Sequence, residues 1–439
     1  MTTTLEALNR IECTSAHQNY LSHGTEEIID YGIPHHCEAS PLGPTFIPSL
    51  DTYLTHARSN TFTLQEPAVQ SGLENVQEHE ATSSLNHGDL FEIQGPSGSG
   101  KTQLSLFLVM TSILPDKVKF RLDDLCKQST AKSTDAIHEL DLGGKSQTVI
   151  FIHPSTHPSP VLRLAKLITT HVKNCLPPSD TRMTEEMQTE LARKIVKRSL
   201  SRLTVFQVPL TNASFLPSDL QSPYASLAAT LAFIPHHVSR INQELGLLLI
   251  DGVGDGFWQA RWQREQRIKE KKPRPSPAGI RSSQSVSMDD IVGKIDKLRR
   301  DLGCAVVVTN QAIWKPLADE KNQGPATHYW SQHLPAPYPS PFDKSTKRPD
   351  QNPAPMKTTT PYWPLTAHIT LLPVTTSMRQ MRPDVLLYEV LRKDGEGDKR
   401  EQARLRARAR GLVRLPGQLS GAQVGEFSFA VKDDEIETW

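Results

Sequence analysis

The chain has 439 residues, which is long enough for one large domain or roughly two to three average ones. Its 33 prolines and 37% hydrophobic residues predict one packed core interrupted by segments that do not pack. The formal net charge of +1 excludes a polycation that coats nucleic acid along its whole length, so any nucleic-acid binding must come from local basic patches.

The cysteine pattern and the first residues of the sequence indicate an intracellular protein. The five cysteines are scattered without a C-x-x-C pair or metal-ligand spacing, as expected of reduced thiols. The start MTTTLEALNRIE contains acidic residues and lacks the apolar region of a targeting signal, and no window approaches the roughly 18 apolar residues of a membrane span. We therefore expect a soluble protein of the cytoplasm or nucleus.

Apolar segments alternate with helical ones from about residue 85 onward, whereas residues 1–84 lack a strong periodicity and predict a partly irregular N-terminal extension. Buried strands are predicted at 89–94, 147–152, 204–210, 245–251 and 304–311. Helices are predicted at 102–114, 160–172, 184–203, 223–236 and 288–302. Apolar strands separated by helices are typical of a parallel sheet covered on both faces. The sequence therefore predicts an α/β domain of the ATPase type over residues 85–439.

Three segments interrupt this alternation and predict irregular insertions. Residues 115–145 are polar, residues 259–286 are basic and then rich in proline and serine, and residues 315–364 contain eleven prolines. The last two segments directly follow strands whose carboxyl ends are expected at one edge of the sheet. Because ligands of open α/β sheets bind at that edge, these two insertions are candidate functional loops.

The sequence GPSGSGKT lies between a predicted strand and a predicted helix and fits the phosphate-loop pattern G-x-x-x-x-G-K-[ST]. In such a loop glycines let backbone N–H groups turn toward the phosphates, a lysine contacts the β and γ oxygens, and a threonine hydroxyl binds Mg²⁺. The sequence therefore predicts a site for ATP and Mg²⁺. The residues predicted to bind the nucleotide are Gly95, Pro96, Ser97, Gly98, Ser99, Gly100, Lys101 and Thr102.

A second element of the site is LLLID, where four apolar residues of a buried strand end at Asp251. An aspartate in this position holds Mg²⁺ through water in many nucleotide-binding proteins. Taken alone, the pattern is equally typical of a core strand capped by a solvated aspartate. The phosphate loop upstream favours the metal role, so Thr102 and Asp251 are the predicted Mg²⁺ ligands.

Two families of phosphate-loop proteins fit less of the chain than a third. LSGAQ at residues 419–423 imitates the LSGGQ signature of transporter-type ATPases, but it lies far downstream of Asp251, and Gly252 stands where those ATPases have a glutamate. A kinase that transfers phosphate to a small molecule or a nucleic acid stays an alternative, since GPSGSGKT occurs in such enzymes too. No segment with firm spacing marks the arginine-bearing lid that a kinase needs.

The third family is indicated by CAVVVTNQ at residues 304–311, which resembles the strand of RecA-like recombinases that ends in Thr-Asn-Gln. In that family the glutamine senses the γ-phosphate, which implies the same role for Gln311. Three further sequences resemble the eukaryotic recombinase paralogues, in particular the X-ray-repair cross-complementing type 2 branch: GDLFEIQGPSGSGKTQL, VIFIHPSTHPSPVLRL and LLLIDGVGDGFW. The resemblance spans residues 85–312 and, more weakly, the chain from 363 onward.

The resemblance implies a RecA-like phosphate-loop core with a mostly parallel central sheet flanked by helices, plus disordered insertions. It also implies an accessory protein of homologous-recombination DNA repair, acting in the nucleus. Such paralogues work in complexes with related subunits, so other RecA-like recombinase paralogues are the implied partners. A scaffold in which the nucleotide only stabilises the fold is a further alternative.

One departure from the family bears on hydrolysis. Active RecA-like ATPases carry a glutamate that activates the attacking water after the strand equivalent to VIFI, and this position falls at about Ser155. Serine is not an efficient general base without help, and His153 is a poor substitute. If residues 153–156 are only a polar loop, the consequence is the same. The sequence predicts ATP binding with weak or no hydrolysis.

The basic insertion carries the predicted DNA contact. Residues 259–282 hold eight Lys or Arg against two acidic residues, with Trp258 and Trp262 close by. Cations neutralise phosphates and aromatic rings stack on bases, so the run suits single-stranded or branched DNA. A solvated flexible segment, or a nuclear import signal in KEKKPRP, has the same composition. The residues predicted to contact DNA are Arg261, Arg264, Arg267, Lys271 and Lys272.

Overall fold

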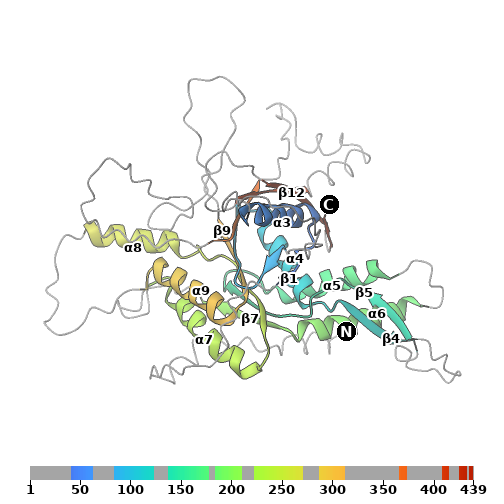
Figure 1. Ribbon diagram of the computed structural model, residues 1–439. Coiled ribbons are helices and arrows are strands. Elements are labelled where there is room, and N and C mark those ends of the chain that lie inside the picture. The colour runs from blue at the N-terminus through green and yellow to red at the C-terminus, as the bar shows by residue number, and fades with distance from the viewer. Residues whose placement is uncertain are drawn as a thin grey trace, which may run out of the picture.

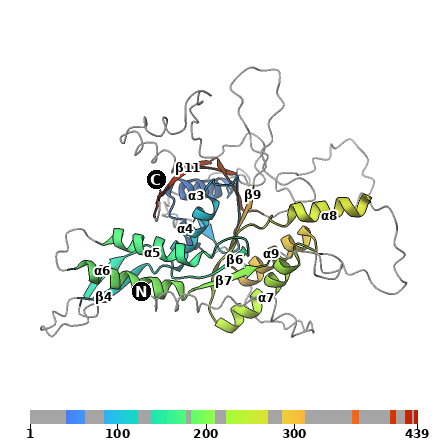
Figure 2. The same cartoon turned by 180° about the vertical axis from the view of Figure 1, so that it is seen from behind.

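A computed structural model describes ten parts of the chain, and these parts form an α/β fold. The described residues are 41–62, 84–122, 137–176, 183–209, 222–269, 286–311, 365–372, 408–414, 425–432 and 435–438. They build one large mixed sheet with helices on both faces, as Figure 1 and, from behind, Figure 2 show.

The sheet has nine strands in the order β13-β12-β11-β10-β3-β9-β8-β6-β7. Neighbours from β10 to β7 pair in parallel, whereas β11, β12 and β13 continue the sheet in antiparallel fashion. The predicted parallel sheet is therefore confirmed for its central strands, and one edge is antiparallel. The strand bounds are β3 (Leu90–Gly95), β6 (Thr148–Pro154), β7 (Leu203–Val208), β8 (Leu245–Ile250), β9 (Ala305–Gln311), β10 (Ala367–Leu372), β11 (Arg408–Arg414), β12 (Gly425–Lys432) and β13 (Glu435–Thr438).

The central strands are buried on both faces, which explains why they are apolar throughout. All residues of β3, β6 and β8 are buried. One face carries Phe91 and Ile93 and packs under α3 (Pro48–Phe62), α4 (Lys101–Ile113), α5 (Val161–Cys175) and α6 (Glu185–Leu200). The other face carries Leu90 and Val306 and packs under α7 (Ala225–Ile241) and α9 (Met288–Leu302). The five predicted helices are confirmed within a few residues.

Local sequence signals fix several of the helix ends. Helix α9 begins with a capping box, in which the side chains of Ser287 and Asp290 each accept a hydrogen bond from the other residue's backbone N–H. Its end at Gly303 has a positive φ, which glycine adopts without strain. Helix α6 is capped by Thr184, whose hydroxyl accepts the N–H of Met187 at 3.3 Å.

Part of the predicted N-terminal extension packs on the same core. Strand β1 (Pro41–Gly43) pairs with β2 (Leu85–Asn86), and α3 lies against β12. Leu50 and Leu54 of α3 are buried in the core beneath α4. Residues 41–62 thus contribute to the main fold, while a domain boundary near residue 85 stays a prediction.

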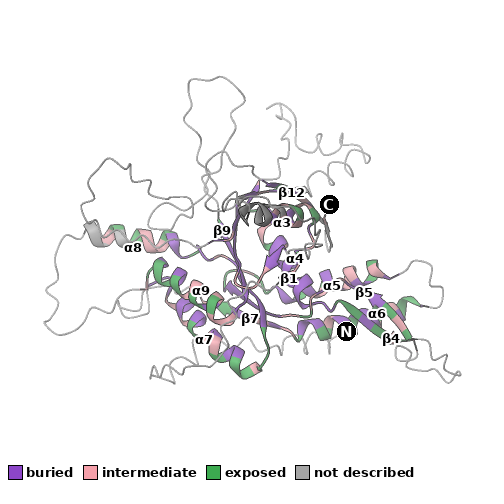
Figure 3. Ribbon diagram, in the orientation of Figure 1, coloured by how far each residue is buried: buried purple, intermediate pink, exposed green. Residues whose placement is uncertain are grey.

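Two of the segments predicted as irregular contain regular structure. Within residues 115–145, β4 (Lys117–Arg121) and β5 (Ile137–Asp141) pair as an antiparallel ribbon with Val118 opposite Leu140. The basic run after β8 begins as helix α8 (Phe257–Lys269), which extends away from the sheet in Figure 1. Figure 3 shows that α8 is buried at its start and intermediate or exposed over its other described residues. The proline-rich segment 315–364 lies outside the described residues. None of the described helices is long and apolar enough to cross a membrane.

Candidate functional site

The glycine-rich loop connects the end of β3 to the start of α4. Gly98 and Gly100 have φ angles of 77° and 93°, which favour glycine. At Gly95 an added Cβ would lie 2.4 Å from Ser99 Oγ, so only glycine fits this close turn. Helix α4 begins at Lys101 without a side-chain cap, so its first backbone N–H groups are left for an external acceptor. The backbone therefore has the form of an anion cradle.

The side chains of this loop are arranged as expected for a phosphate site. Lys101 Nζ donates hydrogen bonds to the carbonyl oxygens of Gly95 and Pro96, both at 2.8 Å. Burial lowers the pKa of Lys101, although Asp251 and Asp255 act in the opposite direction. Ser99 Oγ is buried and has no hydrogen-bond partner. A lysine held by its own loop and an unsatisfied buried hydroxyl both fit a phosphate group.

Ser97 and Gly98 form the exposed tip of the loop, and Thr102 is exposed on the first turn of α4. The Thr102 hydroxyl lies 3.4 Å from Asp251 Oδ2. The two predicted Mg²⁺ ligands therefore lie side by side, although 149 residues separate them in the sequence.

Asp251 follows β8 and is held rigidly. Its backbone N–H donates to the carbonyl of Ile152 at 2.8 Å, and its Oδ1 accepts a hydrogen bond from Thr309 Oγ1 at 2.6 Å. Burial favours the neutral acid, but hydrogen bonds from His157 and Thr309 outweigh it and hold the pKa of Asp251 below its usual value. Asp251 is therefore a carboxylate with one oxygen, Oδ2, directed toward Thr102.

Gln311 is the last residue of β9 and stands directly beside Gly95 in the register of the sheet. Gln311 is exposed, and its N–H donates to Asn310 Oδ1 at 2.9 Å. Strands β3, β9 and β8 are consecutive neighbours, so the loop, Gln311 and Asp251 all lie at one edge of the sheet. These predicted residues are thus brought together from three distant parts of the chain.

Two residues of this site were missed by the sequence reasoning. His157 Nδ1 lies 3.3 Å from Asp251 Oδ2, and His157 Nε2 lies 3.7 Å from Asp255 Oδ2. The hydrogen bond to Asp251 raises the pKa of His157. Burial raises the pKa of Asp255. The signals were present in the HPSTHPSP and DGVGD sequences, but their spacing alone does not predict that the side chains meet.

The position expected for a catalytic base carries no base. Ser155 is exposed just beyond β6, and its backbone N–H donates to the carbonyl of Val208 at 2.8 Å. His153 is buried, burial lowers its pKa, and its Nδ1 lies 3.0 Å from the carbonyl oxygen of Pro154. His157 turns both ring nitrogens toward carboxylates.

Thr102 and Asp251 fit Mg²⁺, which favours oxygen ligands and is held by one or two carboxylates together with water and nucleotide phosphates. When bound, the ion would neutralise charge on those phosphates. Within the described ranges, no group of three or more His, Cys, Asp or Glu side chains is arranged to hold a metal ion.

The predicted DNA-contact residues lie on α8 and just beyond it. Arg261 Nε lies 3.1 Å from Glu265 Oε1, and the Arg261 guanidinium carbon lies 5.7 Å from the centre of the Trp258 ring. Trp258 and Trp262 are 50% and 61% exposed. Arg264 and Arg267 belong to the same helix, whereas Lys271 and Lys272 lie outside the described residues.

Comparison with known proteins gives no further assignment. No protein-family model matches the chain, and a search of the curated proteins finds no matching sequence.

Proposed function

We propose that this chain is an ATP-binding RecA-like recombinase paralogue that acts in homologous-recombination DNA repair as one subunit of a complex. The observation that carries this proposal is the meeting of the glycine-rich loop, Asp251 and Gln311 at one edge of three adjacent strands. In open α/β sheets, ligands bind outside the carboxyl ends of the strands. The TNQ ending of β9 beside the loop is what favours the RecA-like class over other phosphate-loop proteins.

ATP in this proposal is a conformational or assembly element, with weak or no hydrolysis. The resemblance puts the expected glutamate base at about Ser155, and serine is not an efficient general base without help. General-base catalysis contributes roughly 10²- to 10⁴-fold to rates, so its absence alone would make turnover slow.

Nuclear DNA and related subunits are the proposed partners. Helix α8 begins at the same edge of the sheet as the nucleotide site, and it combines Arg261 with the exposed rings of Trp258 and Trp262. Exposed tryptophans beside cations suit the stacking of single-stranded or branched DNA. Other RecA-like paralogues are proposed as the subunits that complete the complex.

Isolation of the protein from its own cells tests this function. We expect other RecA-like proteins to copurify with it, and we expect the purified complex to bind ATP without transferring the γ-phosphate to an acceptor. Isolation without such proteins, together with phosphate transfer to a nucleotide or another small molecule, would instead establish the kinase alternative.

The DNA contact is tested by neutralising Arg261, Arg264, Lys271 and Lys272 together and measuring affinity for single-stranded DNA against salt. Each lost phosphate contact should reduce, by about 1, the slope of the logarithm of the binding constant against the logarithm of the salt concentration. The matched control neutralises four exposed basic residues of α6, namely Arg193, Lys194, Lys197 and Arg198. An unchanged slope in the α8 variant, or an equal change in the α6 variant, would remove this assignment.

A further inference from the structure

Both oxygens of Asp251 already have partners within the chain. Oδ1 accepts the hydrogen bond of Thr309, which fixes the plane of the carboxylate. Oδ2 is the oxygen near Thr102, and it is also the oxygen that His157 Nδ1 contacts at 3.3 Å. The contact to His157 therefore uses the one oxygen that is directed toward the proposed metal position.

Asp255 holds the opposite side of the same imidazole. Its Oδ2 lies 3.7 Å from His157 Nε2, and its backbone N–H donates to the carbonyl of Gly252 at 3.0 Å in a tight turn. Gly252 has a φ of 80°, and an added Cβ there would lie 2.6 Å from Asp255 Oδ2. The glycine thus leaves the space into which the Asp255 carboxylate folds back toward the site.

His157 lies on a segment that allows its ring to rotate away from the two carboxylates. The segment 155–159 connects β6 to α5, and its residues are exposed except for His157, whose side chain is 39% exposed. The described contacts of its backbone are local, since His157 N–H donates to the carbonyl of Pro154 at 3.0 Å. Rotation of the ring into solvent breaks the two contacts with carboxylates and leaves the strand pairing intact.

We propose that His157 is a self-blocking residue: without nucleotide it bridges Asp251 and Asp255, and it must release Asp251 Oδ2 before Mg²⁺ binds there with ATP. The proposal rests on the proposed nucleotide site and adds a regulation of that site. The release links nucleotide binding to the segment that leads into α5, since the same side chain belongs to both.

Removal of the ring tests the competition. In His157→Ala, less Mg²⁺ is needed to reach half-maximal binding of a fluorescent ATP analogue, on the order of two- to fivefold less, as expected for loss of a partly exposed competing contact. Binding of the analogue in EDTA does not become tighter, because no metal competes there. A general disturbance of the site would instead weaken binding under both conditions. All titrations are made at one pH and one ionic strength.

The control is His171→Ala, which removes a histidine of α5 whose Nε2 lies 3.0 Å from the carbonyl oxygen of Leu142. This variant should leave the Mg²⁺ requirement unchanged. As a second readout, the ring signal of isotope-labelled His157, assigned by its loss in His157→Ala, should shift when Mg²⁺ and ATP are added together. The shift should be absent in Lys101→Ala.

The outcomes separate this proposal from the proposed function. If the wild-type chain binds ATP with Mg²⁺ but His157→Ala has the same Mg²⁺ requirement, or the His157 signal does not move, the self-blocking role is wrong and the nucleotide site stands. If the wild-type chain binds no ATP, both proposals fall.

Discussion

Two consecutive residues of β9 supply two polar clusters on opposite faces of the sheet. Thr309 donates to Asp251 on the face covered by α4, and Asn310 Nδ2 donates to Glu92 Oε1 at 3.1 Å on the other face. Side chains alternate along a strand, so neighbours in sequence serve different faces. Each cluster contains a carboxylate and a histidine, and they differ in exposure.

The cluster around Glu92 is closed to solvent. Glu92 and His368 have fully buried side chains, His368 Nε2 lies 3.0 Å from Gln94 Oε1, and Thr370 Oγ1 lies 3.3 Å from His368 Nδ1. Its members belong to the adjacent strands β9, β3 and β10. The cluster around Asp251 has a buried carboxylate as well, but His157 and Asp255 are 39% and 28% exposed. A ligand can therefore reach these groups only in the cluster around Asp251. In the cluster around Glu92 the same groups join neighbouring strands.

The largest effect is expected from breaking the sealed cluster. Glu92→Ala removes the acceptor of Asn310 Nδ2 and the buried carboxylate that lies 3.8 Å from His368 Nε2, and we expect a loss of about 3–5 kcal/mol in the free energy of unfolding. Urea unfolding measures it. The control is Glu426→Ala at the half-exposed pair with Arg410, where we expect a loss below about 1 kcal/mol. Equal losses in the two variants would show that burial does not separate the two kinds of cluster.

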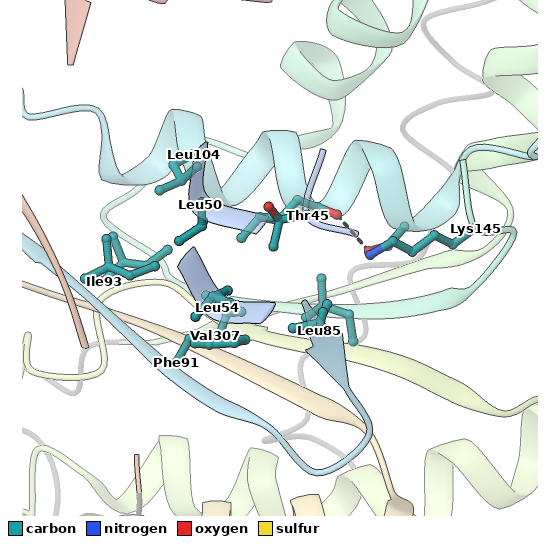
Figure 4. A pocket seen from close by; sticks show the side chains of 13 residues that line it. Thr45, Leu50, Leu54, Leu85, Phe91, Ile93, Leu104, Lys145 and Val307 are labelled. Atoms are coloured by element: carbon teal, nitrogen blue, oxygen red, sulfur yellow. Dashed lines mark hydrogen bonds between the residues drawn. The ribbon is translucent and has the colours of Figure 1, made fainter. Parts of the chain in front are cut away.

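Lys145 provides an intermediate case, a partly buried charge without such a network. Figure 4 shows it at one end of a narrow apolar cavity lined by residues such as Leu50, Leu54 and Ile93. Its ammonium lies 5.7 Å from the centre of the Phe46 ring. Burial lowers the pKa of Lys145 to about 8 from 10.5, against the opposing effect of Asp51.

The sign of the pH dependence follows from this lowered pKa. Between pH 8 and 10.5 the unfolded chain binds the proton of Lys145 more strongly than the folded chain does. The contribution of Lys145 to the free energy of unfolding therefore rises with pH, by up to about 3 kcal/mol across this window. Below pH 8 both states are protonated and the folded state bears the full cost of burial. We expect Lys145→Met to remove this rise, and unfolding of both proteins at pH 7 to 10 measures the difference. Parallel curves would contradict the burial of the charge.

A smaller effect is expected from the open cluster. Thr309→Val removes the donor to Asp251 Oδ1 and the acceptor of the Gly252 N–H, which lies 2.8 Å from Thr309 Oγ1. We expect a loss of about 1–2 kcal/mol in the free energy of unfolding, together with weaker Mg²⁺-dependent ATP binding. A loss as large as that of Glu92→Ala, with unchanged ATP binding, would reverse the roles assigned to the two clusters.

The sequence predicts the parts of this fold whose burial is uniform. Strands β3, β6, β8 and β9 have long apolar runs, so their existence and approximate bounds follow from composition. The ribbon of β4 and β5 is not predicted by apolar runs, because KVKFR and IHELD bury few residues and their pairing joins separate segments. Helix α8 is not predicted, because among its described side chains only Phe257 at its start is deeply buried and its charges resemble those of a loop.

The candidate site is predictable only where the backbone dictates the residue. Glycines with positive φ and a lysine at the start of a helix leave a fixed pattern, so Gly98, Gly100 and Lys101 are found from spacing. His157 and Asp255 lie close together because β6 and β8 are neighbouring strands. The order of strands in the sheet cannot be predicted from the sequence of either segment. The Glu92 cluster was not predicted for the same reason, and its polar residues lie within strands that are otherwise apolar.

The proposed role of the glycine-rich loop is to hold ATP without fast turnover. The most direct test is Mg²⁺-dependent ATP binding and ATP hydrolysis, with and without DNA, by the purified wild-type protein and Lys101→Ala. We predict ATP binding that falls by about tenfold to a hundredfold in Lys101→Ala, as expected for lost charge-assisted hydrogen bonds, and little hydrolysis in either protein. Rapid DNA-stimulated hydrolysis that disappears in Lys101→Ala, or no ATP binding by the wild-type protein, would contradict the claim.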